Sequence, residues 1–424
     1  MKVTFMGAGS TVFAKNVLGD IMLTPALREC DIALYDIDPE RLEESYLMVT
    51  ALNRNINENR ASVSKYLGVE ERKDALRGAD FVINAIQVGL YDPCTIIDFE
   101  VPKKYGLRQT IADSNGIGGI FRALRTIPVL KDFTDDMKEV CPNAYFLNYT
   151  NPMAQLAGWL GRYSGVKSVG LCHSVQACSR GLLDKLDIKY SEPIRERIAG
   201  INHMGWLLEI EDANGTDLYP EIRKRATEVL ESGVTNHNDL VRFEYIKRFG
   251  YYCTESSEHN AEYNNFFIKR RCVEQIKNWK NEKDNYIHDK VSHERTKEYA
   301  SYIMEAIVTD NPYKIGGNVI NRGLIPNLPD DACVEVACLV NKCGIQPCRQ
   351  EPLPLQLAAM NNLMINVQLL TIEAAVTQKK DYIYQAAMLD PHTSSELSID
   401  EIVHLCDDLI EAHGDYLLKS TPPA

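Results

Sequence analysis

The stretch from Met1 to Asp36 constrains the fold more than any other part of the sequence. The apolar segment Lys2–Met6 runs into the glycine-rich turn Gly7-Ala8-Gly9-Ser10, and a helical pattern over Val12–Met22 and a second apolar segment over Asp31–Tyr35 follow. A strand, a glycine turn, a helix and a strand in this order are typical of the first unit of a doubly wound parallel sheet. The N-terminus of a helix after such a turn offers free N–H groups to a phosphate.

The turn and the end of the second strand predict the ligand. Gly7 permits a tight turn and Gly9 lets a pyrophosphate approach the backbone, although Val12 stands where the full fingerprint has a third glycine. Asp36 ends the second strand, where a carboxylate accepts hydrogen bonds from both ribose hydroxyls and repels a 2′-phosphate. A tight turn without a ligand is the alternative. We predict bound NAD, with contacts from Gly7, Gly9, Ser10, Thr11, Val12, Asp36 and Asn84.

The alternation of strands and helices continues to about residue 170. Further strands are predicted over Phe81–Ile86, Ala144–Tyr149 and Ser168–Leu171, and further helices over Pro39–Leu52 and Phe121–Val140. This pattern predicts an α/β fold in which helices cover both faces of a parallel sheet. We expect residues 1–195 to form a Rossmann-type domain that binds NAD.

The pattern changes after residue 195. Helical stretches over Tyr219–Gly233, Glu294–Val308 and Ile399–Tyr416 dominate this part, a buried helix is predicted within Leu353–Val376, and few strands are evident. We expect residues 196–424 to form a second, α-rich α+β domain that binds the substrate and mediates oligomerisation.

Charge and composition exclude several classes of function. The net charge is −13 and no Lys/Arg block is present, so we expect no nucleic-acid partner. No apolar run reaches the ~18 residues that a membrane span needs, and the start lacks the pattern of a signal peptide. The 12 cysteines follow no disulfide spacing. We therefore expect a cytoplasmic protein with reduced cysteines and no membrane partner.

A cysteine and a histidine, Cys172 and His203, suggest a metal site. Cys172-His173 directly follows the predicted strand Ser168–Leu171, at the end where parallel sheets bind ligands. His203 lies further along, in Asn202-His203-Met204. A thiolate and an imidazole suit a divalent transition ion, and two ligands leave positions open for substrate and water. The alternative is that Cys172 and His203 are ordinary core residues.

Several motifs together resemble glycoside hydrolase family 4. They are Gly7-Ala8-Gly9-Ser10, Asp113-Ser114-Asn115-Gly116-Ile117-Gly118-Gly119, Arg122-Ala123-Leu124-Arg125-Thr126-Ile127-Pro128, Asn148-Tyr149-Thr150-Asn151-Pro152-Met153 and Asn202-His203. Cys172-His173-Ser174-Val175-Gln176 and Thr254-Glu255-Ser256-Ser257-Glu258-His259 are similar to the bacterial α-galactosidase branch of that family. The resemblance extends from Met1 to about Tyr416.

The resemblance implies hydrolysis of a small neutral α-galactoside such as melibiose, with NAD and Mn²⁺ or another divalent transition ion as cofactors. Family 4 differs from two-carboxylate glycosidases in depending on NAD. The implied route is oxidation at C3 of the sugar, proton removal at C2, elimination at C1, addition of water and return of the hydrogen to C3. A homodimer or homotetramer is also implied.

The resemblance assigns a role to each polar residue of the motifs. Cys172 and His203 match the metal ligands, and Asn151 matches a substrate-binding asparagine. His173 stands where the phosphoglycosidase branch carries an acid aspartate, so it is either the acid or a ligand of a sugar hydroxyl. The same branch has an Arg near position 95, whereas this chain has Cys94-Thr95-Ile96-Ile97, which favours a substrate without a 6-phosphate.

The base is the least determined of these roles. Tyr251 matches a tyrosine of an aromatic pair that follows an arginine, and Asp113 matches the acidic residue that polarises it. A free tyrosine has a pKa of about 10 and needs such help to act as a base. Tyr252, Glu255 and Glu258 are the alternatives.

Two other functions fit parts of the sequence. An NAD-dependent 2-hydroxyacid dehydrogenase of the lactate/malate type shares the glycine turn and an Asn-Pro after a later strand, but has no need of Cys172. Such an enzyme would accumulate NADH with its substrate, whereas a family 4 hydrolase would not. A non-enzymatic NAD-sensing module would not need Asn151, Cys172 and His203 together at strand ends.

Overall fold

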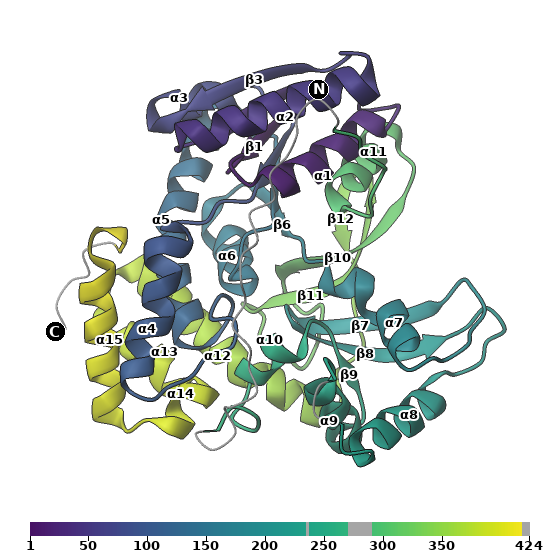
Figure 1. Ribbon diagram of the computed structural model, residues 1–424, viewed down its shortest axis with the longest axis vertical. Helices are drawn as coiled ribbons and strands as arrows, with labels where there is room; N and C mark the ends of the chain where they lie inside the picture. Colours follow the sequence, from purple (N-terminus) through teal and green to yellow (C-terminus); the bar gives the residue numbers. More distant parts are fainter. Residues whose placement is uncertain (235–236, 270–290, 418–424) are drawn as a thin grey trace.

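The computed structural model describes residues 1–234, 237–269 and 291–417, and its strands form a single sheet. The 12-stranded sheet has the order β3-β2-β1-β4-β5-β6-β10-β11-β7-β8-β9, and β12 pairs with β11 (Figure 1). Strands from before and after residue 195 therefore belong to one continuous sheet.

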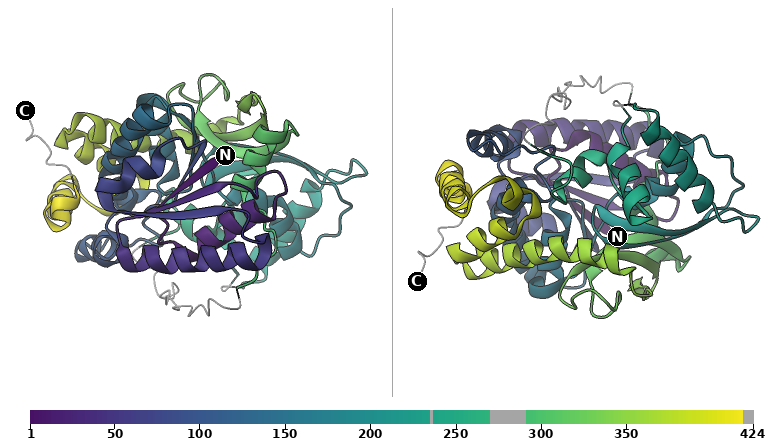
Figure 2. Two further views of the ribbon diagram at one scale, coloured as in Figure 1. Left: turned by 90° about the horizontal axis from the view of Figure 1, so that it is seen from above. Right: turned by 90° about the horizontal axis from the view of Figure 1, so that it is seen from below.

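The strands from β3 to β6 are parallel and form the predicted doubly wound part. They are β1 (Lys2–Met6), β2 (Asp31–Asp36), β3 (Ser62–Leu67), β4 (Phe81–Asn84), β5 (Tyr145–Asn148) and β6 (Lys167–Gly170). Side chains alternate between two cores, since Val3 and Phe5 join one apolar cluster and Met6 joins another. Figure 2 shows helices on both faces of these strands, as the sequence predicts.

The α-helices of this part are α1 (Thr11–Leu23), α2 (Pro39–Asn57), α3 (Gly68–Leu76), α4 (Ile96–Lys104), α5 (Gly116–Val140), α6 (Met153–Trp159) and α7 (Ser174–Lys185). The sequence predicts α1, α2 and α5 with ends close to these bounds, whereas it does not predict α3, α4, α6 and α7. The long helix α5 begins at Gly116 rather than at the predicted Phe121. Its first turn therefore includes the glycines that follow Asp113.

The expectation of few strands after residue 195 is wrong. Six strands follow in the described ranges, namely β7 (Arg195–Ile201), β8 (Met204–Glu211), β9 (Tyr252–Cys253), β10 (Tyr313–Ile320), β11 (Cys333–Asn341) and β12 (Gly344–Pro347). Gly316 and Gly317 lower the strand propensity of β10, but close packing requires them. A Cβ on Gly316 would lie 2.9 Å from Val175, and one on Gly317 would lie 2.7 Å from the Cys338 sulfur.

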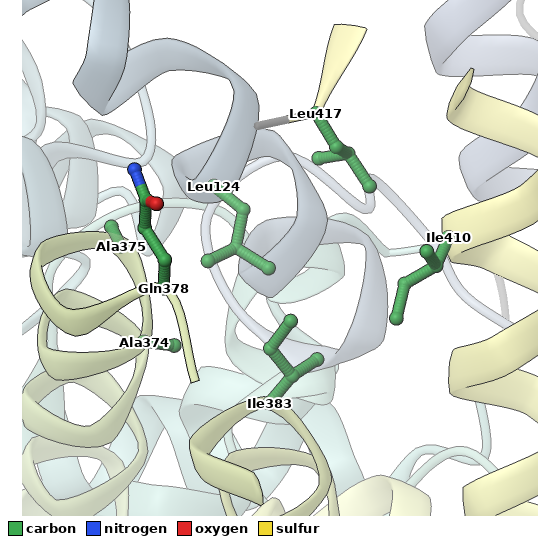
Figure 3. Close-up of a pocket in the computed structure, with 7 residues that line it drawn as sticks. All are labelled: Leu124, Ala374, Ala375, Gln378, Ile383, Ile410 and Leu417. Atoms are coloured by element: carbon green, nitrogen blue, oxygen red, sulfur yellow. The ribbon is translucent and has the colours of Figure 1, made fainter. Parts of the chain in front are cut away.

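The remaining helices form two groups, and one helix, which begins at Tyr299, lies apart from both beside α1 (Figure 1). They are α8 (Tyr219–Glu231), α9 (Leu240–Phe249), α10 (Ser257–Glu262), α11 (Tyr299–Thr309), α12 (Leu355–Thr377), α13 (Lys380–Leu389), α14 (Pro391–Glu396) and α15 (Ile399–His413). Helices α12 to α15 gather beside α4 and α5, where Leu124, Ala374, Ile383 and Ile410 line a small apolar cavity (Figure 3). No helix in the described ranges is long and apolar enough to cross a membrane.

Helix α11 differs from its prediction at the N-terminal end. It begins at Tyr299, whereas the sequence pattern starts at Glu294. The preceding residues are held instead by Asp20 of α1, whose carboxylate accepts hydrogen bonds from the backbone and side chain of Thr296 at 2.8 and 2.5 Å. The Nε2 atom of His293 lies 2.7 Å from the same carboxylate.

Candidate active site

A cavity of about 470 Å³ opens at the carboxyl ends of the parallel strands. Its volume is in the range of small-molecule sites, and residues from both halves of the chain line it. They are Ser10, Phe13, Ala85, Ile86, Gln87, Asp113, Arg122, Tyr149, Thr150, Asn151, Met153, Leu171, Cys172, His173, His203, Glu255 and His259. The cavity therefore brings together five residues that the sequence predicts for catalysis, substrate binding or the metal, namely Asp113, Asn151, Cys172, His173 and His203.

The predicted nucleotide turn borders this cavity. Gly7 has φ +86°, and a Cβ there would lie 2.8 Å from the backbone of Ala85. The N–H of Gly9 donates to the Asp36 carboxylate at 2.6 Å, so the acid lies beside the turn. No side chain in the described part of the chain caps the N-terminus of α1, which leaves its first N–H groups free for phosphate oxygens. These groups fit a dinucleotide.

Of the other predicted NAD contacts, three lie at or beside the cavity and one is buried behind it. Ser10 lines the cavity, and Thr11 and Val12 occupy the first turn of α1 beside it. Asn84 is fully buried, and its Nδ2 donates to Asn148 at 2.8 Å and to Thr150 at 3.1 Å. Asn84 therefore lies behind the wall of the cavity and supports Thr150, which lines it.

Three ligand atoms converge in the same cavity. One ligand atom each from Cys172, His203 and Glu255 lies within 4.8 Å of the others. The Cys172 sulfur lies 3.9 Å from Glu255 Oε2, and His203 Nε2 lies 3.4 Å from the same oxygen. A thiolate, an imidazole and a carboxylate suit a divalent transition ion and leave coordination positions open, so the residues fit a catalytic metal.

The chain is held in unusual backbone conformations at two of these positions. His203 belongs to the two-residue turn between β7 and β8 and has φ 60°, and Glu255 follows β9 with φ 67°. Residues other than glycine rarely adopt this left-handed region, and such conformations cluster at functional sites. Asn260 stabilises the turn, because its Nδ2 donates to the His203 carbonyl at 2.9 Å and to the Thr254 carbonyl at 3.0 Å.

Electrostatics prepare the cluster for a cation. Burial, together with the charges of Glu335 and Glu255, raises the pKa of the Cys172 thiol well above its ordinary value. Burial alone would raise the pKa of Glu255 as well, but the neighbouring His203 and His259 lower it overall. A divalent cation reverses the effect at the thiol by stabilising the thiolate, and its binding therefore releases a proton.

Asp113 is the centre of a second polar group in the cavity. Its Oδ2 accepts a hydrogen bond from Asn151 Nδ2 at 3.2 Å, and its Oδ1 lies 3.4 Å from His259 Nε2. Burial would raise the pKa of Asp113, but His259 and Arg122 lower it well below its usual range. Asp113 is thus an ionised hydrogen-bond acceptor beside a donating amide, which suits two neighbouring sugar hydroxyls.

His173 is held from outside its own helix. Its Nε2 lies 2.8 Å from both carboxylate oxygens of Glu298, the residue that precedes α11. The hydrogen bond to Glu298 raises the pKa of His173 above its ordinary value, although burial opposes this. The ring also lies 6.0 Å from that of Tyr149 and 6.4 Å from that of Phe13.

The structure does not bring the predicted base, Tyr251, to the cavity. Helix α9 ends at Phe249, Gly250 turns the chain with φ +89°, and Tyr251 packs its ring 5.9 Å from Tyr219. Tyr252 is 1% exposed and donates to Asp239 at 3.1 Å. Both tyrosines pack in the apolar cluster around α8 and α9. A match of sequence motifs cannot tell a tyrosine that packs in a core from one that acts in the site.

Among the alternative bases, the carboxylates differ. Glu258 belongs to α10 and does not line the cavity, whereas Glu255 does. Arg122 and His259 line the cavity and Glu298 holds His173, but the sequence alone predicts none of them. Arg122 and His259 lie inside motifs that were recognised, but a motif alone does not tell which of its side chains face the ligand. Glu298 lies in no recognised motif.

Comparisons with known proteins identify the family of the chain. The family model described as Family 4 glycosyl hydrolase matches residues 2–188, and the model of the Family 4 glycosyl hydrolase C-terminal domain matches residues 198–393. The chain is 57% identical to an α-galactosidase of Bacillus subtilis (strain 168), over 98% of this chain and 99% of that protein. It is 31% identical to an α-galactosidase of Rhizobium meliloti (strain 1021), over 98% and 89% of the two chains.

Solved structures share the fold. A 6-phospho-α-glucosidase from gut microorganisms, crystallised with NAD and Mn²⁺, superposes with a TM-score of 0.80 at 19% identity, and the alignment covers 99% of both chains. At this identity the likeness concerns the arrangement of the strands and helices.

Proposed function

The chain belongs to glycosyl hydrolase family 4, and we propose that it is an α-galactosidase that hydrolyses small neutral α-galactosides such as melibiose with NAD and a divalent metal ion. The observation that carries this proposal is the convergence of Cys172, His203 and Glu255 in the cavity that the nucleotide turn borders. When bound, NAD supplies reversible oxidation of a sugar carbon, and the metal, Mn²⁺ or a similar ion, supplies Lewis-acid stabilisation of negative charge.

The roles of the protein's own side chains follow from their positions. Cys172 and His203 would hold the metal. Asn151 would donate to one sugar hydroxyl, and Asp113 would accept from the next, because the two side chains already lie 3.2 Å apart. His173 would face the glycosidic oxygen or a neighbouring hydroxyl, since it lines the same cavity.

We assign proton removal at C2 to Glu255. Of the four candidates Tyr251, Tyr252, Glu255 and Glu258, it is the one that lines the cavity. Neighbouring imidazoles lower its pKa, which keeps the carboxylate ionised, the form that accepts a proton, but also makes it a weaker base. Its carboxylate also lies close enough to ligate the metal, and the two roles make different predictions for the variant Glu255→Gln.

The cavity favours a neutral substrate. In the described ranges Arg122 is the only Lys or Arg that lines it, and Asp113 offsets its charge. A 6-phosphate group would need a cation that is not already balanced. The absence of an arginine near Thr95 agrees with this.

Several features of the proposal go beyond the site itself. We propose a cytoplasmic protein that acts as a homodimer or homotetramer, with residues 1–195 binding NAD and 196–424 supplying most of the substrate-binding and subunit contacts. The 2-hydroxyacid dehydrogenase alternative is not favoured, because the family matches extend over both parts of the chain.

One assay tests the proposal as a whole. Nitrophenyl α- and β-galactosides and glucosides are offered to the protein with and without NAD and Mn²⁺. We expect hydrolysis of the α-galactoside alone, and only when both cofactors are present. Activity that persists without NAD, or that accumulates NADH in step with substrate, would contradict the proposal.

A further inference from the structure

A buried carboxylate holds one nitrogen of His173, the residue that follows Cys172. Glu298 is 8% exposed, and both of its oxygens lie 2.8 Å from His173 Nε2. The ring proton on Nε2 is therefore donated to Glu298. In the part of the chain that the structure describes, no hydrogen bond involves the other ring nitrogen, Nδ1, which remains available to a ligand in the cavity.

Glu298 is itself fixed by contacts with the nucleotide-binding helix. Its N–H donates to Thr296 Oγ1 at 3.2 Å, and Thr296 is bonded through its backbone and side chain to Asp20 of α1. Asp20 is fully buried. The ring of His293 packs on α1 so closely that a Cβ on Gly19 would lie 2.4 Å from it. The segment before α11 is thus anchored firmly on α1.

Two aromatic residues limit the orientation of the His173 ring further. Tyr149 and Phe13 line the cavity, and their ring centroids lie 6.0 and 6.4 Å from that of His173. The Tyr149 hydroxyl in turn accepts a hydrogen bond from the N–H of Ala300 at 2.9 Å, in the first turn of α11. The start of α11 therefore holds both His173 and its aromatic neighbour.

We propose that Glu298 is a positioning residue, which fixes the His173 ring so that Nε2 is committed to the protein and Nδ1 faces the substrate. A carboxylate that holds one ring nitrogen sets the tautomer and the orientation of the other. For an imidazole that ligates a metal, loss of such a partner typically costs about 10- to 100-fold in metal affinity or activity, and we expect a loss of similar order for the His173 ring. The kinetic consequence rests on the proposed α-galactosidase function, whereas the contact itself does not.

A kinetic test compares Glu298→Ala with Glu305→Gln, which removes one carboxylate from α11, the helix that Glu298 precedes. Glu305 pairs with Arg295 at 2.7 Å, and neither residue lines the cavity. We expect Glu298→Ala to lower kcat on melibiose by about tenfold or more with KM within about threefold, and Glu305→Gln to leave both unchanged. An unchanged kcat in Glu298→Ala, or an equal loss in the control, would overturn the proposal.

A double-mutant cycle separates positioning from general destabilisation. In a His173→Asn background, Glu298→Ala should have no further effect on kcat, because the residue acts through the missing ring. A loss of the same size in both backgrounds would mean that Glu298 acts independently of His173 and would overturn the proposal.

A spectroscopic test works without any activity. In protein labelled with ¹⁵N in its histidines, the Nε2–H of His173 should give a proton signal protected from exchange, identified by its loss in His173→Asn. The signal should disappear in Glu298→Ala and persist in Glu305→Gln. Its persistence in Glu298→Ala would overturn the positioning role. A lost signal in protein that hydrolyses no α-galactoside would instead support the contact and contradict the proposed function.

Discussion

The Nε2 atom of His203 lies 3.4 Å from the Oε2 atom of Glu255, although the two residues come from separate turns of the sheet. This contact brings a carboxylate to the metal pair that the sequence predicts. We propose that Glu255 is either a third ligand or, in place of the predicted Tyr251, a base beside the metal.

Replacement of Glu255 by glutamine distinguishes the two roles. A base cannot be replaced by an amide, so Glu255→Gln should lower kcat by about 10²- to 10⁴-fold. If Glu255 is the base, the affinity for Mn²⁺, measured by calorimetry, should change by less than about tenfold. A complete loss of Mn²⁺ binding would identify Glu255 as a ligand and contradict its assignment as the base.

The variant Tyr251→Phe tests the correction of the predicted base. Tyr251 packs against Tyr219 outside the cavity, so loss of its hydroxyl should leave kcat within about threefold of the parent. Tyr252→Phe is a useful companion, since it breaks the bond to Asp239 and should affect thermal stability more than turnover. A Tyr251→Phe protein that is stable, binds NAD and yet is inactive would restore the tyrosine as the base.

Metal removal tests the role of Cys172. Dialysis against a chelator should abolish turnover, and Mn²⁺ should restore it. Cys172→Ser should weaken Mn²⁺ binding by at least about 10- to 100-fold, because the variant loses the thiolate. Binding of Mn²⁺ should also release protons, since burial raises the pKa of the free thiol. A Cys172→Ser protein with unaltered metal affinity would contradict the assignment.

We expect the folding stability of the metal-free protein to depend on pH through the buried carboxyl group of Glu335. It is 1% exposed on β11, and its Oε1 accepts a hydrogen bond from Asn318 at 2.9 Å. Burial raises its pKa from 4.5 to about 7, against the opposing effects of Asn318 and His203. The folded state thus holds the proton more tightly than the unfolded state. The resulting stabilisation is complete below pH 4.5 and is lost as the pH rises to about 7.

Thermal melts at several pH values test whether the folding stability decreases as the pH rises, as predicted. The Tm of the parent should fall between pH 5 and pH 7 by more than that of Glu335→Gln, which has no proton to lose at this position. Glu305→Gln serves as a control on the surface and should follow the parent. Identical pH profiles in the parent and Glu335→Gln would contradict the effect.

Five of the six parallel strands and the helices α1, α2 and α5 were predictable because their signals are local, whereas β3, α3, α4, α6 and α7 were not predicted. Apolar strands, a glycine turn and helical periodicity each occupy a few adjacent residues. The position of β10 and β11 between β6 and β7 was not predictable from the sequence, since it depends on antiparallel pairing between strands far apart in the chain. The two glycines of β10 even weaken the local pattern of a strand. They are required because the side chains of Val175 and Cys338 pack against them.

The site was predictable to a similar extent. Cys172, His203, Asn151 and Asp113 lie where their motifs suggested, because strand ends of a parallel sheet meet at one edge. Tyr251 was matched by a local pattern of aromatic residues, which does not encode the direction of a side chain after a turn. Glu298 lies 125 positions from His173, and no local pattern could have linked them.

The most direct test of the mechanism is the fate of two hydrogens of the galactose released in heavy water. Removal of the C2 proton by a cavity base should place deuterium at C2 in each turnover, while the hydrogen taken from C3 returns and is kept. Product NMR reads both positions in one spectrum. We expect deuterium at C2 with hydrogen retained at C3. A product that is fully protiated at C2 would indicate direct displacement at C1, as in two-carboxylate glycosidases, and would contradict the proposed mechanism.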